Sequence, residues 1–316
     1  MPLYDELMVD LEKMMDYRKS AGYSVEPYPS TLKPFIKFLA EKYPTSSKIT
    51  QNVVDEWLKH HPFSKDTSQA AFISRLRQFT RFLHAIGKEC FIPDEDYTVR
   101  CQRYNPYLFN DTELTRLFNS IDTYKSHIRN YRTELIIPVL FRMMYCCGMR
   151  PAEPLHLRTE DVNLTTGDIY IRQTKLKKDR HILMSKDMLK LCKAYDSLMG
   201  KHEWFFHSTK GEPISTDWMR CQFHKCWELS GLVKRGNPRP YDLRHVFATR
   251  TMTRWIDSGK DIMVLLPYLS AYMGHANINN TLYYIHLLPD KLRTSSGVNW
   301  GMFDEVYGEV GNDVEN

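Results

Sequence analysis

The segment of residues 133–147 reads as a helix that is apolar on almost every side. Its apolar side chains come from Leu135, Ile136, Ile137, Val139, Leu140, Phe141, Met143 and Met144. A helix of this kind is buried, because no face of it is polar enough to meet water. The chain has no run of 18 apolar residues, so we expect no membrane span and no membrane partner. The sequence therefore predicts a mainly helical domain built around this segment.

The residues around this segment predict further helices and three short strands. Asn110 stands where an N-cap would begin a helix over residues 111–121. Strands are expected at Val162, at residues 169–171 and at residues 181–183, with turns between them. Further helices are expected over residues 151–157, 185–199, 215–229, 241–256 and 263–273. The pattern predicts a mainly α domain with a small three-stranded antiparallel sheet over residues 110–294.

The first 88 residues predict a separate, all-helical domain. Apolar residues recur at helical spacing in four segments, which begin near residues 3, 30, 50 and 66. We expect the fourth helix to end near Gly87. Residues 89–109 break the periodicity and read as an exposed linker between the two domains.

The tail, residues 295–316, is rich in glycine and contains an amphipathic piece that begins at Trp300. Its apolar stripe is too short to form a core of its own. We therefore expect the tail either to fold back on its own domain or to dock in a neighbouring protomer.

Composition permits nucleic-acid binding without requiring it. The net charge of +5 over 316 residues is modest, and the position of the charges matters more than their sum. None of the seven cysteines shows metal-site spacing, so we expect no metal ion and a reduced, cytoplasmic protein. The acidic, amphipathic N-terminus does not resemble a secretion signal.

Residues 273–286, MGHANINNTLYYIH, carry the side chains best suited to covalent chemistry. If this stretch is helical, Tyr283 and Tyr284 leave the axis about 100° apart, so only one can face a given site. A tyrosine is a covalent nucleophile when an electrophile is held in line with it and the charge is neutralised. Candidate neutralising groups lie far upstream, at Arg150, Lys175 and Arg244.

The order of these residues resembles that of the tyrosine recombinases, the family that includes phage integrases, the Xer recombinases and Cre. Arg150 and Glu153 match the family's R-x-x-E-like box. Lys175 matches a lysine that the family carries in a β-hairpin. The resemblance extends over nearly the whole chain and rests on four boxes in the right order.

The remaining two boxes lie near the C-terminus. Residues 241–245, YDLRH, match a box that usually reads H-x-L-R-H. Gly274 and His275 match the family's Gly-His, and Tyr284 follows nine residues after that histidine, with His286 two residues further on. The resemblance identifies Tyr284 as the nucleophile.

The resemblance implies that the tyrosine attacks a scissile phosphodiester, forming a 3′-phosphotyrosyl bond and releasing a 5′-hydroxyl. Two arginines would bind the non-bridging oxygens, and the hairpin lysine would protonate the leaving oxygen, which an arginine cannot do because its pKa is too high. Neither metal nor ATP is needed, because the covalent link keeps the phosphodiester energy. The implied catalytic residues are Arg150, Lys175, Tyr241, Arg244, His275 and Tyr284, with Glu153 orienting Arg150.

The sequence departs from the family pattern at Tyr241, where a His or Lys is usual. A tyrosine can donate a hydrogen bond to a phosphoryl oxygen, but it cannot be positively charged. His245 is in phase with the apolar side of the predicted helix and reads as a structural residue.

Basic residues outside the boxes are candidate contacts to DNA phosphates. On the fourth helix they are expected opposite the apolar face, where the alternative is a solvated surface. At the hairpin tip and in the loop before residue 241, the alternative is solubility alone. These residues are Arg75, Arg77 and Arg81, then Lys177, Lys178 and Arg180, then Lys234, Arg235 and Arg239.

The resemblance further implies a two-domain clamp on double-stranded DNA and a homo-tetramer assembled on two DNA sites, with or without host or element-encoded accessory proteins. No additional domain precedes the first helix, which favours a simple recombinase or the integrase of a small mobile element. The alternatives are a type IB topoisomerase and a DNA-binding accessory protein that has lost catalysis. The sequence leaves open the target site and the choice among integration, transposition and dimer resolution.

Overall fold

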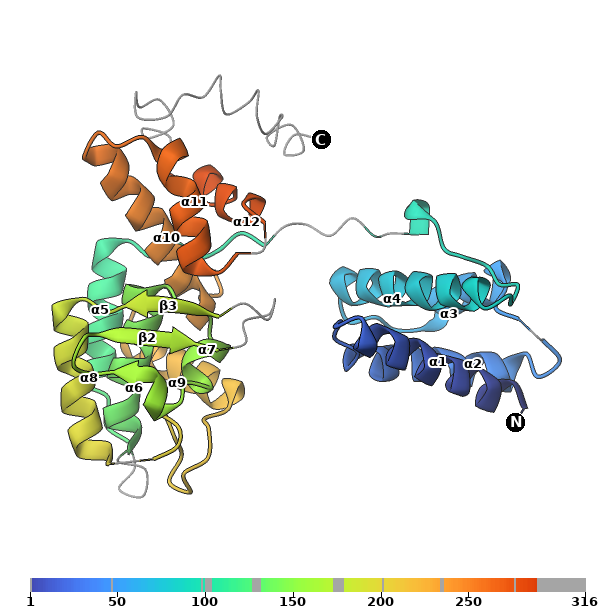
Figure 1. Cartoon of the computed structure of the whole chain (residues 1–316), viewed down its shortest axis with the longest axis horizontal. Coiled ribbons are helices and arrows are strands. Elements are labelled where there is room, and N and C mark those ends of the chain that lie inside the picture. The colour runs from blue at the N-terminus through green and yellow to red at the C-terminus, as the bar shows by residue number, and fades with distance from the viewer. Residues whose placement is uncertain are drawn as a thin grey trace. The chain divides into compact units, whose positions relative to one another are not determined.

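The computed structural model describes residues 2–46, 48–97, 99, 104–126, 132–172, 179–200, 202–233, 236–275 and 277–288. The chain divides into two compact units, Met1–Tyr104 and Asn105–Asn316 (Figure 1). Both units are mainly helical, and the second also contains a three-stranded antiparallel sheet. This confirms the fold class expected from the sequence. The expected tail, residues 295–316, lies outside the described residues.

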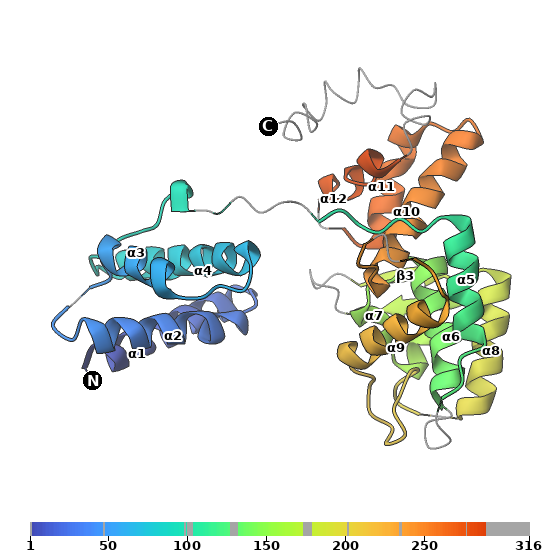
Figure 2. The same cartoon turned by 180° about the vertical axis from the view of Figure 1, so that it is seen from behind.

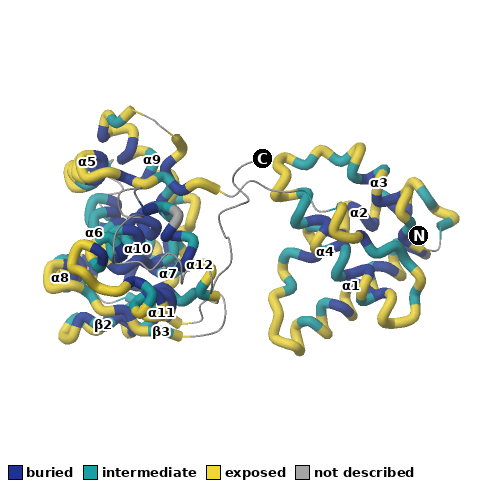
Figure 3. Tube along the Cα trace, turned by 90° about the horizontal axis from the view of Figure 1, so that it is seen from above, coloured by how far each residue is buried: buried dark blue, intermediate teal, exposed yellow. Residues whose placement is uncertain are grey.

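Four helices form the first unit, as the apolar spacing predicted. Their apolar sides meet in one core, in which Leu11, Phe35 and Phe79 have no exposed surface. Buried and exposed positions alternate along these helices (Figure 3). The second helix begins earlier than expected, because a proline is well suited to the first turn of a helix. The helices are α1 (Pro2–Ser20), α2 (Pro27–Lys42), α3 (Gln51–His60) and α4 (Asp66–Ala85).

The three arginines of α4 do not share one face, and that expectation was wrong. Arg75 and Arg77 leave the helix roughly 200° apart, because each residue turns the helix by about 100°. Arg75 donates to the hydroxyl of Thr31 at 2.9 Å, whereas Arg77 donates to the carbonyl of Pro93 at 2.6 Å. Arg81 is exposed.

The expected linker, residues 89–109, is not exposed along its length. Its first part returns to the first unit, where the Phe91 N–H donates to the Ile49 carbonyl at 2.8 Å. A short 3₁₀ turn, η1 (Glu95–Tyr97), follows, and the Tyr97 hydroxyl donates to Asp55 at 2.7 Å. The last part belongs to the second unit, because Phe109 is buried in that unit's core. Apolar side chains at both ends of the segment pack against the cores of the two units. The polar residues in its middle led to the prediction that the whole segment is exposed.

The helix α6 (Arg132–Cys147) is the central helix of the second unit, as its composition predicted. Ile137, Leu140 and Phe141 have no exposed surface. Seen from behind, α5 and α9 lie on the side of α6 away from the sheet (Figure 2). The helices packed around α6 include α5 (Asp111–Asp122), α8 (Lys186–Met199) and α10 (Pro240–Asp257), and α9 (Thr216–Leu229) packs against α5 and α10.

Asn110 caps α5 as expected. Its side-chain oxygen accepts from the Glu113 N–H at 2.8 Å, and the Glu113 carboxylate accepts from the Asn110 N–H at 3.0 Å. This reciprocal capping box satisfies two donors at the helix start and fixes the residue at which α5 begins.

The three expected strands pair in the order β1-β2-β3, with Ile169 opposite Ile182. They are β1 (Val162–Asn163), β2 (Asp168–Ile171) and β3 (Arg180–Leu183), and β1 follows a 3₁₀ turn, η3 (Thr159–Asp161). The turn between β2 and β3 with Lys175, Lys177 and Lys178 lies outside the described residues. Arg180, expected at the exposed tip, instead begins β3 with a side chain that is 8% exposed.

The C-terminal helices form a second apolar cluster that includes Tyr284. Gly274, with φ +65°, adopts the left-handed conformation that ends α11. No helix of the described residues is long and apolar enough to cross a membrane. The elements here are α11 (Ile262–Met273), α12 (Asn279–Leu282) and the 3₁₀ turn η4 (Ile285–Leu287), while the short α7 (Ala152–Leu155) follows α6.

Candidate active site

Four of the residues predicted to be catalytic come together where the ends of α6, α10 and α11 meet. Arg150 follows α6, Arg244 lies in the second turn of α10, and His275 follows α11. Tyr284 lies between α12 and η4. Tyr241, the residue that departs from the family pattern, lies about one turn before Arg244 on α10.

The C-terminal end of α11 accepts hydrogen bonds from three arginines. A helix leaves its last carbonyls without partners and carries partial negative charge at that end. The arginine side chains supply the missing donors, and the carbonyls offset part of the clustered positive charge. The pairs are Arg180 with the Tyr272 carbonyl at 2.9 Å, Arg244 with the Met273 carbonyl at 2.7 Å, and Arg150 with the Gly274 carbonyl.

Glu153 lies between two of these arginines. Its carboxylate accepts from the Arg150 N–H at 2.7 Å and from Arg150 Nη1 at 2.9 Å, and Arg180 donates two further bonds at 2.8 and 2.7 Å. Burial by itself would raise the pKa of Glu153, but the hydrogen bonds and charge of Arg180, together with the Arg150 N–H, outweigh it and lower that pKa. The contact between Glu153 and Arg150 that the box predicts is present.

Arg244 is completely buried and binds His275 directly. Its Nη1 donates to the Gly148 carbonyl at 2.7 Å, and its Nη2 lies 2.9 Å from His275 Nε2. Because the arginine can only donate, Nε2 accepts, and the Nδ1–H donates to the Thr281 hydroxyl at 2.7 Å. Burial, followed by the charges of Arg244 and Arg150, lowers the pKa of His275 to about 3, so the imidazole is neutral at pH 7. Arg244 Nε is buried and has no partner among the described residues, which leaves a donor for a ligand.

Tyr284 is the tyrosine that faces this cluster. It is 2% exposed, and its ring stacks on His275 with centroids 6.0 Å apart. Burial raises the pKa of Tyr284 to about 12, and the charge of Arg244 offsets part of that rise. Tyr283 is only partly buried. The phenol of Tyr284 is therefore protonated at neutral pH.

His245 is buried, as expected, but it also contacts Tyr284, the predicted nucleophile. Its ring centroid lies 5.0 Å from that of Tyr241 and 5.5 Å from that of Tyr284. Burial, followed by the charges of Arg239 and Arg244, lowers the pKa of His245 to about 4. Sequence reasoning missed this contact, although the four-residue spacing from Tyr241 places both side chains on one face of α10.

Arg180 is the second residue whose place was missed. The sequence contained a signal for the burial of Arg180. Side chains two positions apart point to the same side of a strand, and Ile182, two positions after Arg180, is apolar and therefore expected to face the core. Ile182 has no exposed surface, and Arg180 points to the same side of the sheet. Alternation along β3 would therefore have predicted an inward arginine.

Several predicted site residues lie outside the described residues. They are Lys175, Lys177, Lys178, Lys234 and Arg235, together with the side chain of His286. Arg239 precedes α10, and its N–H donates to Asp242 at 2.8 Å while its side chain is 40% exposed. No group of three or more His, Cys, Asp or Glu in the described part of the chain could bind a metal ion.

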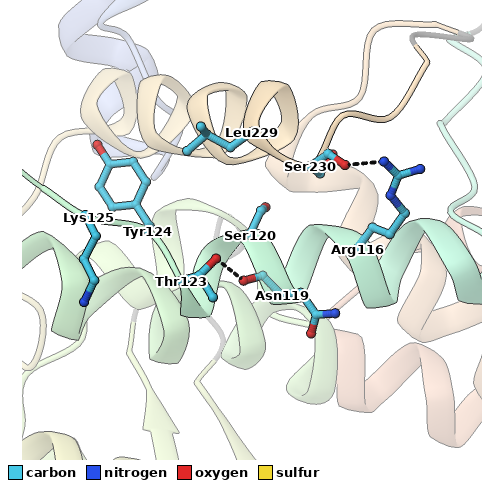
Figure 4. Close-up of a pocket in the computed structure, with 8 residues that line it drawn as sticks. All are labelled: Arg116, Asn119, Ser120, Thr123, Tyr124, Lys125, Leu229 and Ser230. Atoms are coloured by element: carbon cyan, nitrogen blue, oxygen red, sulfur yellow. Dashed lines mark hydrogen bonds between the residues drawn. The ribbon is translucent and has the colours of Figure 1, made fainter.

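A recess of about 550 Å³ between α5 and the end of α9 shares no residue with this cluster (Figure 4). Two of its polar side chains are paired within the protein. Arg116 donates to the Ser230 carbonyl at 2.7 Å, and the Ser120 hydroxyl donates to the Cys226 carbonyl at 2.7 Å. The arginine cluster, rather than this recess, is the candidate active site.

Comparison with known proteins shows the family of the chain. Residues 108–291 match the model of the Phage integrase family, and residues 11–87 match that of the phage integrase N-terminal SAM-like domain. The putative integrase/recombinase y4rE of Sinorhizobium fredii is 26% identical over 87% of this chain and 90% of its own length. Tyrosine recombinase XerC of Staphylococcus saprophyticus is 23% identical over 87% of this chain and 90% of its own length.

The fold is similar to that of a lambda integrase solved as a tetramer bound to a Holliday junction. The two share 16% sequence identity and a TM-score of 0.60, over 88% of this chain and 76% of the lambda protein. The integrase family match covers more than half of the chain and includes every box of the arginine cluster. The protein therefore belongs to the phage integrase family and is a site-specific DNA recombinase of the tyrosine type.

Proposed function

We propose that this recombinase cleaves and rejoins DNA through a covalent 3′-phosphotyrosyl intermediate on Tyr284. The observation that carries the proposal is the meeting of Arg150, Arg244 and His275 around the Tyr284 ring. A phosphodiester bears negative charge that grows on its non-bridging oxygens during attack. Donors fixed in a buried site stabilise such charge far better than water does.

The two arginines supply the charge for the phosphate. Arg150 is 22% exposed on its side chain, and Arg244 offers its buried Nε. His275 is neutral and its one N–H donates to Thr281, so it adds no charge and instead holds Arg244 through its Nε2. Tyr241 adds a neutral donor at the position where a charged residue is usual. The phosphate therefore depends on two guanidinium groups for its neutralisation.

Cleavage transfers the phosphoryl group to the phenol oxygen of Tyr284. The bond from that oxygen to phosphorus forms as the bond to the 5′-oxygen breaks. The phenol proton passes to a neutral imidazole in contact with the ring, that of His245 or His275, and Lys175 delivers a proton to the leaving oxygen. The reverse reaction with a new 5′-hydroxyl reseals the strand. Neither metal nor ATP is required, because the covalent intermediate retains the energy of the phosphodiester.

The partner is double-stranded DNA, which both units bind as a clamp, and the active assembly is a homo-tetramer on two DNA sites in the cytoplasm. The lambda integrase tetramer on a Holliday junction supports this assembly by similarity of fold. Phosphate contacts are proposed for basic residues of α4, of the turn between β2 and β3, and of the loop before α10. They are Arg75, Arg77, Arg81, Lys177, Lys178, Lys234, Arg235 and Arg239; Arg180 is left out because its guanidinium is buried.

The test is covalent trapping on suicide substrates. Nicked duplexes drawn from the ends of the protein's own genetic neighbourhood are incubated with wild type, Tyr284→Phe and Tyr283→Phe, and denaturing gels separate the adduct. We expect a slowly migrating protein–DNA band for wild type and Tyr283→Phe. Tyr284→Phe should bind DNA in a shift assay and form no band.

An adduct formed by Tyr284→Phe would contradict the choice of nucleophile. Tight DNA binding without any adduct from wild type would favour a DNA-binding protein that has lost catalysis. Relaxation of plasmid that lacks a target site would instead favour a type IB topoisomerase.

A further inference from the structure

We propose that Arg180 is a positioning residue of the phosphate-binding site rather than a contact to DNA. It orients Glu153, and through Glu153 it orients Arg150, while it also fixes the turn that carries His275. The inference rests on the proposed function, because it assumes that Arg150 and His275 act on a DNA phosphate.

The guanidinium group of Arg180 is fully engaged inside the protein. Nη1 and Nη2 donate to the two oxygens of Glu153 at 2.8 and 2.7 Å, and Nε donates to the Tyr272 carbonyl at 2.9 Å. The side chains of both Arg180 and Glu153 are 8% exposed. Each of its three nitrogens donates inside the protein and the side chain is buried, so the group is not presented to a phosphate. A fork on a carboxylate also has a defined geometry.

The same guanidinium lies against Gly274. A Cβ built on Gly274 would be 3.0 Å from Arg180 Nη1, which is closer than ordinary van der Waals contact. The backbone of Gly274 is left-handed, and its carbonyl accepts from Arg150. The residue immediately before His275 is therefore in contact with Arg180 on one side and with Arg150 on the other.

One carboxylate thus connects two arginines, and each arginine bonds to a carbonyl at the end of α11. If Arg180 were lost, Glu153 would keep its charge but lose two of its four donors, and it could rotate toward the place where the phosphate must bind. The carbonyl of Tyr272 would lose its donor as well. We therefore expect a misplaced Arg150 and a loosened His275 turn.

The sequence position of Arg180 gives it a second connection. It is the first residue of β3, at the end of the segment that carries Lys175. A defect in Arg180 variants could therefore arise at the phosphate site or at the lysine. A substrate with a 5′-bridging sulfur separates the two, because a thiolate leaves without needing a proton from the lysine.

The decisive variant is Arg180→Lys, which keeps the charge but loses the fork. A positioning role predicts unchanged DNA affinity, an unchanged salt dependence of binding and cleavage slowed roughly 10- to 100-fold, as is typical when an orienting partner is lost. A role in phosphate contact predicts that Arg180→Lys remains active. It also predicts that Arg180→Met binds more weakly, with a salt dependence reduced by about one phosphate contact.

Arg172 provides the matched control, because it lies just after β2, on the other arm of the same hairpin. It forms ion pairs with Glu160 and Asp161 and is 49% exposed on its side chain. Arg172→Lys should therefore leave both affinity and cleavage at the wild-type level. A second measurement is the combination of Arg180→Lys with Glu153→Gln. Its cleavage defect should be smaller than the product of the two single defects, because both changes act in part through one carboxylate.

The experiment measures single-turnover cleavage of oxygen- and sulfur-bridged suicide duplexes, DNA affinity at several salt concentrations, and thermal unfolding. Cleavage by Arg180→Lys that is slow on both substrates, with normal affinity and a folded protein, supports the inference. Cleavage by Arg180→Lys at the wild-type rate overturns the inference. So does a cleavage defect that disappears on the sulfur-bridged substrate, or one that is fully explained by a smaller fraction of folded protein. A wild-type protein that forms no adduct overturns the proposed function, and the inference with it.

Discussion

Replacing Gly148 with alanine should destabilise the second unit and displace Arg244. Gly148 ends α6 with φ +62°, and its carbonyl accepts from Arg244 Nη1 at 2.7 Å. An added Cβ would lie 2.7 Å from Cε1 of Phe247 and closer still to Cδ1. Because this ring stacks on Tyr272 with centroids 5.7 Å apart, it cannot move aside without disturbing the end of α11.

The expected cost has two parts. The left-handed backbone costs a residue with a Cβ about 1–2 kcal/mol, and overpacking a well-filled site typically adds about 1–3 kcal/mol. Their sum, about 2–5 kcal/mol, lowers the melting temperature by roughly 4–20 °C, since each kcal/mol is worth about 2–4 °C in a unit of this size. Gly259 isolates the backbone part, because it has φ +69° and nothing within 4 Å of an added Cβ.

Urea and thermal unfolding of wild type, Gly148→Ala and Gly259→Ala measure these terms, and suicide trapping measures the displacement of Arg244. We expect Gly148→Ala to be clearly less stable than Gly259→Ala and to cleave more slowly. Adding Phe247→Ala should relieve the clash, so the double variant should be more stable than the two single losses predict together. Equal stability of the two alanine variants would refute the reasoning, as would strict additivity with Phe247→Ala.

Two further substitutions test the contacts of the site. Glu153→Gln breaks a buried ion pair, which costs about 3–5 kcal/mol of stability. The urea midpoint of this variant should therefore fall well below that of the exposed control Glu203→Gln. Equal midpoints of the two variants at pH 7 would contradict the pairing of Glu153 with the arginines. Because the pKa of Glu153 is lowered from its ordinary value of 4.5, the stability that its charge contributes is fully present above pH 4.5 and is lost as the pH falls below it. Thr281→Val keeps the shape of the side chain but removes the oxygen that accepts from His275 Nδ1, so cleavage in the trapping assay should fall roughly 10- to 100-fold. Wild-type cleavage by that variant would mean that the hydrogen bond does not position the imidazole.

Much of the fold followed from local patterns. The apolar composition of residues 133–147 predicted a central helix, and Asn110 with Glu113 predicted the start of α5. These features depend on residues a few positions apart, which interact in the same way in almost any fold. The two units divide after Tyr104, within the segment expected to be a linker. That segment is less exposed than expected, because Phe91 and Phe109 pack against cores whose other members lie far away in the sequence.

The arginines show where local reasoning stops. Their residue type identified all of them as candidate anion contacts, but charge alone does not distinguish a surface arginine from a buried one. Arg180 is buried because Glu153 and the Tyr272 carbonyl offer it three acceptors, and the latter lies 92 positions away. Arg75 and Arg77 lie on different faces of α4 because a helix turns by about 100° at each residue. Their spacing in the sequence already implied this, but a count of basic residues does not take spacing into account.

The family, the helical character of both units and the identity of the candidate nucleophile follow from local patterns, because spacing within a box involves residues close together in the chain. The hydrogen-bond partners of the site residues depend instead on the packing of distant segments. Arg150 and the Gly274 carbonyl are separated by 124 positions, and Arg244 and the Gly148 carbonyl by 96. Such contacts form because the ends of α6, α10 and α11 are brought together by the core around α6. Long-range packing sets that geometry, and no local pattern encodes it.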